Sequence, residues 1–124
     1  MRHLNRKNLK FNGKDRNHRD AMLRNLVTNL IVHKAVNTTE KRANAAQEWV
    51  DRLFVRVNER LSAGDLLNAI RFAQPILTTI AASKELMRIA PSYKDRKGGV
   101  TRATPFKFRV GDGAKLVRLE LLAA

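Results

Sequence analysis

A β-hairpin is the clearest local signal in the chain, and it lies in residues 106–121, which read FKFRVGDGAKLVRLEL. Apolar and charged side chains alternate on both sides of the central glycines, which is the period of a strand with one buried face. The pair Asp112-Gly113 is typical of the tight turn that joins two such strands. Pro105 lacks an amide hydrogen and indicates an edge strand or a strand start. The buried face is expected to carry Phe106, Phe108, Val110, Val117, Leu119 and Leu121.

In the part of the sequence that precedes the Gly98-Gly99 pair, the apolar residues follow helical spacing instead of alternation. A first helix is expected to begin with Asn17 as its N-cap, with Asp20 in the place of a capping-box acid, and to end near His33. Its apolar side chains recur at intervals of three and four residues: Met22, Leu23, Leu26, Val27, Leu30 and Ile31.

Three more helices are expected in the middle of the chain, after a short strand over residues 35–38. Thr39 is a suitable N-cap for the first of them, whose apolar stripe continues to residue 61. The next helix is expected over residues 65–73 and the last over residues 76–89. Large aromatic side chains on the long helix, Trp49 and Phe54, are interpreted as core residues.

These elements predict an α+β fold with two layers. About four helices pack on a small mixed or antiparallel sheet that ends in the C-terminal β-hairpin. Residues 1–16 show no period and too few apolar side chains to offset their ordering entropy, so we expect an extended basic N-terminal arm that is disordered when free. Residues 17–124 are expected to form a single globular α/β domain, because a chain of 124 residues suits one core.

The charge of the chain is strongly basic and concentrated at its two ends. The sequence holds 25 Lys and Arg against 11 Asp and Glu, a net charge of +14. Residues 1–24 hold eight basic and two acidic side chains, and residues 94–124 hold eight and three. The middle is nearly balanced by comparison. The ends are therefore expected to meet a polyanion, with an affinity that falls steeply as salt rises.

The residue types that build catalytic or metal sites are sparse. Cysteine is absent, and His3, His18 and His33 are too far apart in sequence to form a helical ligand pair. No pair of acids suggests an acid and a base, and no phosphate-binding loop is present. We expect no catalytic residues, no metal, no cofactor and no small-molecule substrate. No run of residues is apolar enough to span a bilayer, and no membrane partner is expected.

Composition leaves several polyanion-binding classes open. DNA and RNA are not distinguished by charge, so a DNA-compacting protein with Leu9 or Phe11 as a minor-groove wedge is one alternative. A peripheral membrane protein that uses the first helix is another. The basic leader also permits a transit peptide, although Asp15 and Asp20 fit such a peptide poorly.

Two sequence blocks carry a resemblance that is more specific than composition. Residues 18–25 read HRDAMLRN, and residues 93–102 read YKDRKGGVTR, followed by RVGDGA at residues 109–114. Together with the opening MRH and LNR, they resemble the bacterial large-subunit ribosomal protein family numbered seventeen over nearly the whole chain. The chain departs from that family's pattern at Val100, Gly113, Lys115 and around Asn44 and Gln47.

The resemblance implies a structural constituent of the large ribosomal subunit. Family members have a compact α/β body and an arm inserted into large-subunit rRNA near the polypeptide exit tunnel. The implied partners are large-subunit rRNA and neighbouring large-subunit ribosomal proteins around the tunnel. The implied location is the cytoplasm, in the large ribosomal subunit, with an organellar ribosome as the alternative. The arm's folding partner would then be RNA.

The expected RNA-binding residues come from the resemblance and from charge. Those that match the family's arm and first helix are Arg2, His3, Asn5, Arg6, His18, Arg19, Arg24 and Asn25. Those that match in the second block are Gly98, Gly99, Thr101, Arg102 and Arg109. Charge alone adds Lys7, Lys10, Lys14, Arg16, Lys97 and Lys107.

Overall fold

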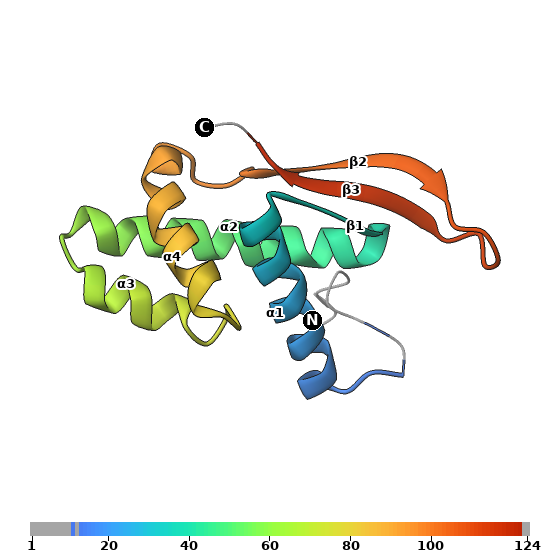
Figure 1. Cartoon of the computed structure of the whole chain (residues 1–124), viewed down its shortest axis with the longest axis horizontal. Helices are drawn as coiled ribbons and strands as arrows, with labels where there is room; N and C mark the ends of the chain where they lie inside the picture. The colour runs from blue at the N-terminus through green and yellow to red at the C-terminus, as the bar shows by residue number, and fades with distance from the viewer. Residues whose placement is uncertain (1–10, 12, 123–124) are drawn as a thin grey trace, which may run out of the picture.

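The computed structural model describes residue 11 and residues 13–122, and these residues form two layers. Four α-helices lie on one side of a three-stranded sheet (Figure 1). In chain order the elements are α1 (Arg16–His33), β1 (Ala35–Thr39), α2 (Glu40–Ser62), α3 (Leu66–Ala73), α4 (Ile80–Ile89), the 3-10 helix η2 (Ala90–Tyr93), β2 (Thr101–Phe108) and β3 (Lys115–Leu121). The predicted α+β fold is confirmed.

The sheet is antiparallel in both of its pairings, with the strand order β1-β3-β2. Val36 of β1 and Ala103 of β2 are both opposite Leu119 of the central strand β3. Residues opposite each other share a face, so these three side chains lie toward the helices. Pro105 lies on the edge strand β2, as expected of a residue that cannot donate to a ladder on both sides.

The hydrophobic core is built around α2, and side chains of the sheet and of α1, α3 and α4 complete it. Phe54 of α2 is fully buried, and Trp49 of the same helix is partly buried against the core. Helix α2 supplies more buried side chains than any other helix, since its apolar residues recur at intervals of three and four. The other large buried side chains include Leu23, Val27, Leu30, Ile31, Leu86, Val100, Val117 and Leu119.

The start of α1 differs from the sequence prediction. Asp15, rather than Asn17, is the N-cap, and its carboxylate accepts a hydrogen bond of 2.7 Å from the backbone amide of His18. Asn17 lies inside the first turn. Arg16, which the sequence assigned to the arm, is the first residue of the helix. Asp and Asn are similarly good caps, so local preference alone did not discriminate between the two positions.

The start of α4 also differs from the prediction. The helix begins at Ile80 instead of residue 76, and Thr79 is its cap through a hydrogen bond of 3.2 Å from the amide of Ala82. The residues before Thr79 form turns that bury Leu77 in the core. The sequence prediction started the helix at residue 76, directly after Pro75, whereas the turns continue to Thr79.

The apolar face of β2 is the largest departure from expectation. The exposed fractions of Phe106, Phe108 and Val110 are 47%, 69% and 99%. The register shifts between Pro105 and Lys107, so one residue is inserted into the strand and the alternation changes phase there. On β3 the expectation is confirmed, because Val117 and Leu119 are buried.

Candidate nucleic-acid interface

The outer face of the sheet carries a cluster of cationic side chains. Arg102 and Arg118 both contact the carboxylate of Glu120, with N···O distances of 2.6 and 3.5 Å. The hydrogen bond from Arg102 is the main cause that lowers the pKa of Glu120, so the carboxylate stays ionised between the two arginines. One carboxylate cannot neutralise two guanidinium groups. The face therefore keeps a positive charge toward solvent.

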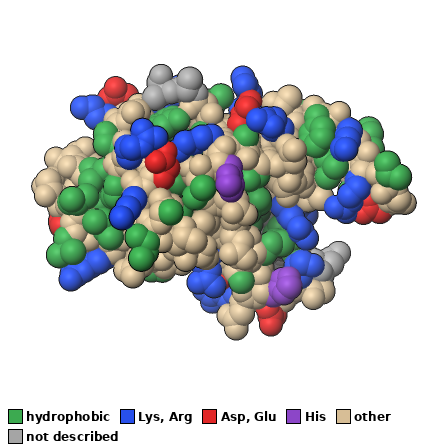
Figure 2. Space-filling view, viewed as in Figure 1, with side chains coloured by type: hydrophobic (Ala, Val, Ile, Leu, Met, Phe, Trp, Pro, Cys, Tyr) green, Lys and Arg blue, Asp and Glu red, His purple; other side chains and the backbone are tan. Residues whose placement is uncertain are grey.

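Lys107 extends this cationic face toward the end of the hairpin. It is opposite Leu116, and Leu116 alternates with the inward-facing Val117, so Lys107 lies on the same outer face as Arg118. Lys and Arg side chains lie next to hydrophobic ones over the end of the β2–β3 hairpin, with an acidic side chain beside them (Figure 2). We call Arg102, Lys107 and Arg118 the sheet-face cluster.

Arg109 stabilises the turn of the hairpin. Its guanidinium donates two hydrogen bonds to the carboxylate of Asp112, at 3.0 and 2.5 Å, and that carboxylate also accepts the amide of Ala114 at 3.1 Å. These donors lower the pKa of Asp112 well below its usual range, the bond from Arg109 having the largest effect. The sequence assigned Arg109 to RNA contact, whereas its bidentate fork is occupied within the chain.

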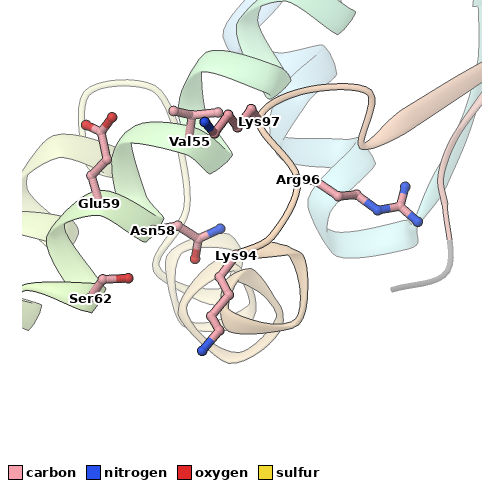
Figure 3. A pocket seen from close by; sticks show the side chains of 7 residues that line it. All are labelled: Val55, Asn58, Glu59, Ser62, Lys94, Arg96 and Lys97. Carbon is pink, nitrogen blue, oxygen red and sulfur yellow. The ribbon is translucent and has the colours of Figure 1, made fainter.

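A second basic region lies beside the C-terminal half of α2. A groove of about 480 Å³ is lined by α2 side chains on one wall and by Lys94, Arg96 and Lys97 on the other (Figure 3). The Nδ2 atom of Asn58 at its base is buried and has no hydrogen-bond partner among the described residues. Glu59 on the same wall forms an ion pair of 3.4 Å with Arg56. Of the residues that line this groove, Lys97 alone was expected from the sequence to contact RNA.

The segment between η2 and β2 is built against α2. Gly99 has a left-handed backbone with φ of 66°, a conformation that glycine adopts without strain. The amide of Val100 donates a hydrogen bond of 3.3 Å to Asp51 of α2. Thr101, expected to contact RNA, is only 8% exposed and points into the body. Residues 98–101 therefore hold the backbone against α2. Arg102, the next residue, is an exposed cation.

The first helix places several expected contacts on its surface. Arg16 and Arg19 both lie within 4 Å of Asp20, at 3.8 and 3.3 Å, while His18 and Asn25 are exposed. Arg24 is half-buried, and its Nε atom is buried with no partner among the described residues. Lys14 precedes the cap. The remaining expected contacts, Arg2, His3, Asn5, Arg6, Lys7 and Lys10, lie outside the described residues.

These positions divide the expected contacts into two regions. Helix α1 brings Arg16, His18 and Arg19 together near its start, and the sheet brings Arg102 and Lys107 together on its outer face. Arg118, Lys94 and Arg96 were not among the contacts predicted from the sequence. The alternation of β3 had already indicated that Arg118 faces outward, and that signal would have identified it.

No cluster of metal-ligating side chains occurs in the part of the chain that the structure describes. Within the same residues no helix combines the length and the apolar character that a bilayer crossing requires.

The geometry alone does not identify the protein family, but similarity to known proteins does. The profile of the family described as ribosomal protein L17 matches residues 22–122. This chain belongs to the ribosomal protein L17 family. The match includes both sequence blocks except the first four residues of HRDAMLRN, together with all three strands. The resemblance carried by those blocks is confirmed.

Individual L17 relatives cover most of both chains. The protein named large ribosomal subunit protein bL17 of Desulforudis audaxviator is 40% identical over 105 residues, covering 85% of this chain and 90% of the relative. That of Carboxydothermus hydrogenoformans is 39% identical over 111 residues, covering 89% and 95%. L17 proteins are structural components of ribosomes and have no enzymatic role, so the expectation that this chain is not an enzyme is confirmed.

Proposed function

We propose that this L17-family chain is a structural constituent of the large ribosomal subunit that binds and cross-links large-subunit rRNA. The observation that carries the proposal is the separation of two cationic regions on one body. The sheet-face cluster lies on the strand layer, and Arg16 and Arg19 lie at the start of α1 in the helix layer. A rigid body with cations on two sides can hold two RNA segments at a constant spacing.

The residues before Asp15 are proposed to form the RNA-binding arm, and the residues from Asp15 onward the single globular domain. Helix α1 supports this division, because it begins at Arg16 with Asp15 as its cap and its buried side chains begin at Leu23. Four of the 25 basic residues, Arg2, Arg6, Lys7 and Lys10, precede residue 11. Their charges would be neutralised by phosphates, with release of counterions.

The finer location is proposed to be the region around the polypeptide exit tunnel, in the cytoplasm of a bacterium. The relatives named bL17 are bacterial proteins, which supports a bacterial ribosome over an organellar one. Neighbouring large-subunit proteins are the second class of proposed partner. An aliphatic groove between α3 and α4, lined by Leu66, Ile70 and Met87, supports a protein contact because phosphates would not favour it.

Sedimentation of the full-length chain tests the proposal. After cell lysis in moderate salt, a tagged chain is expected to migrate with the large subunit in a sucrose gradient, and a density map of that particle would give its neighbours. A chain that stays at the top of the gradient would contradict the proposal. Duplex DNA and anionic liposomes serve as competitors, since binding that either abolishes would favour the DNA or membrane alternative.

The sheet-face cluster is tested with a double variant, Arg102→Gln with Arg118→Gln. We expect weaker binding to purified large-subunit rRNA and a shallower dependence on salt, by about 0.7–0.9 in log–log slope for each phosphate that the variant no longer neutralises. Arg71→Gln is the matched control, because Arg71 is an exposed arginine at the end of α3 in the helix layer. Equal slopes for the double variant and the control would exclude this face from RNA binding.

A further inference from the structure

The end of the β2–β3 hairpin exposes two aromatic rings that the fold does not use. Phe108 is 69% exposed and Phe106 is 47% exposed, and Val110 beside them in the turn is almost fully exposed. Phe54 and Tyr93, by contrast, are buried in the core. Large apolar side chains gathered on one exposed end of a body indicate a binding surface.

The exposure of Phe108 follows from the register and from the length of α2. Phe108 is opposite Lys115, which alternates with the buried Val117, so both lie on the helix side of the sheet. The helix layer ends at this point, because Lys115 reaches Glu40, the first residue of α2, at 3.6 Å. The hairpin continues beyond α2 (Figure 1). No described helix therefore covers the ring of Phe108.

The charges around these rings select the kind of partner. The hairpin residues 105–118 carry Lys107, Arg109, Lys115 and Arg118 against Asp112, and Glu40 of α2 adds a second acid beside Lys115, so basic side chains remain in excess. Asp112 is already paired with Arg109, and the ammonium of Lys107 lies 5.7 Å from the centre of the Phe106 ring. Aromatic faces bordered by an excess of cations complement a ligand that combines flat apolar groups with negative charge. Unpaired nucleotides have both properties.

We propose that the end of this hairpin is a binding site for unpaired RNA nucleotides, in which a base stacks on Phe108 beside Lys115 on the helix side of the sheet. The nucleotide strand passes over the edge strand β2, and Lys107 on the outer face contacts a phosphate there. Phe106, held in the β-bulge, forms a second apolar contact. The site would bind single-stranded loops, whereas the cationic faces can bind the phosphate backbone of paired RNA segments. The inference rests on the proposed RNA-binding function and adds the structural class of RNA that this end recognises.

The test uses a twelve-nucleotide adenosine strand that carries a central 2-aminopurine, and an abasic strand of equal length. Phe108→Leu keeps an apolar side chain at an exposed position, so folding is preserved while the aromatic face is removed. We expect this variant to bind the adenosine strand about tenfold more weakly. Its affinity for the abasic strand should not change, and the change in 2-aminopurine fluorescence that the full chain causes should disappear. Phe108→Trp should retain the affinity and still change the fluorescence on binding.

Two control variants separate stacking from charge and from general apolar contact. Lys107→Gln should weaken binding to both strands by the same factor and reduce the salt slope by about 0.7. Leu67→Ala removes an apolar side chain of similar exposure from α3 and should change neither strand's affinity.

The outcomes distinguish this inference from the proposed function. If the full chain binds large-subunit rRNA but Phe108→Leu binds the adenosine strand as tightly as the full chain does, nucleotide stacking is wrong and the proposed function stands. Equal affinity of the full chain for the adenosine and abasic strands would overturn the inference in the same way. A full chain that binds neither rRNA nor either strand would refute both, and the exposed rings would then point to a protein partner.

Discussion

Tyr93 packs edge-on against Phe54, with ring centres 5.1 Å apart and planes at 72°. Its hydroxyl donates a hydrogen bond to the backbone carbonyl of Leu122. One side chain thus joins η2 to the centre of α2 and to the end of β3. Because burial disfavours the phenolate, the pKa of Tyr93 is raised and the hydroxyl remains a donor.

Removal of the Tyr93 hydroxyl is expected to weaken this junction without changing the core. Tyr93→Phe keeps the ring contact with Phe54 and leaves the carbonyl of Leu122 without that donor. We expect the free energy of unfolding to fall by about 1 kcal/mol in urea titrations. Tyr93→Leu, which also removes the ring contact, should cost more. Equal stability of Tyr93→Phe and the natural chain would show that water replaces the bond.

The N-cap of α1 gives a direct comparison of two neighbouring residues. Asp15→Ala should cost about 1 kcal/mol, because the amide of His18 loses its acceptor. Asn17→Ala should change stability by only a few tenths of a kcal/mol, since Asn17 is exposed within the first turn. Thermal unfolding followed by circular dichroism would rank them. A larger loss of stability in Asn17→Ala than in Asp15→Ala would show that Asn17 is the N-cap, as the sequence suggested.

Thr28 joins α1 to the turn before α4. Its hydroxyl donates to the carbonyl of Arg24 at 2.7 Å and accepts from the amide of Thr78 at 3.1 Å. Thr28→Val keeps the shape of the side chain but removes the acceptor, with an expected cost of about 1–2 kcal/mol. Hydrogen exchange at the Thr78 amide should accelerate in Thr28→Val and remain slow in Thr28→Ser. Unchanged exchange in the valine variant would disprove the contact.

Glu85 predicts a dependence of stability on pH. Hydrogen bonds from Arg88 and then Lys34 lower its pKa from 4.5 to about 2. A lowered pKa in the folded state means that the contribution is complete above pH 4.5 and is lost as pH falls through about 2. The stability difference between the natural chain and Glu85→Gln should follow that course in urea titrations at several pH values. A difference that stays constant from about pH 6 to about pH 2 would contradict the assignment.

Periodicity and capping chemistry were sufficient for most of the fold. Helix α2 has 23 residues, and its apolar residues form a stripe along one face. A stripe of that length indicates an amphipathic helix whose apolar face is buried, so the helix was predictable from the local pattern. The hairpin turn was equally predictable because Asp112 and Gly113 provide the local geometry. Boundaries such as Asp15 and Thr79 were not, since several residues nearby have similar cap preferences.

The candidate interface was predictable in its charge but only partly in its residues. The basic ends of the chain indicated a polyanion before any fold was known, because net charge is additive along a sequence. Whether a particular cation is available depends on its neighbours in space. Arg102 and Arg109 each form an ion pair within the chain, but Glu120 is shared between Arg102 and Arg118, whereas Asp112 pairs with Arg109.

The alternating pattern of β2 and β3 required a strand pair with one apolar face, and this much is a property of the chain itself because side chains alternate wherever a strand forms. The bulge after Pro105 put Phe108 on the helix side of the sheet, and the length of α2 relative to the hairpin left it outside the core. A side chain is buried only where another element packs over it, and whether one does is decided by the tertiary packing of helix and sheet.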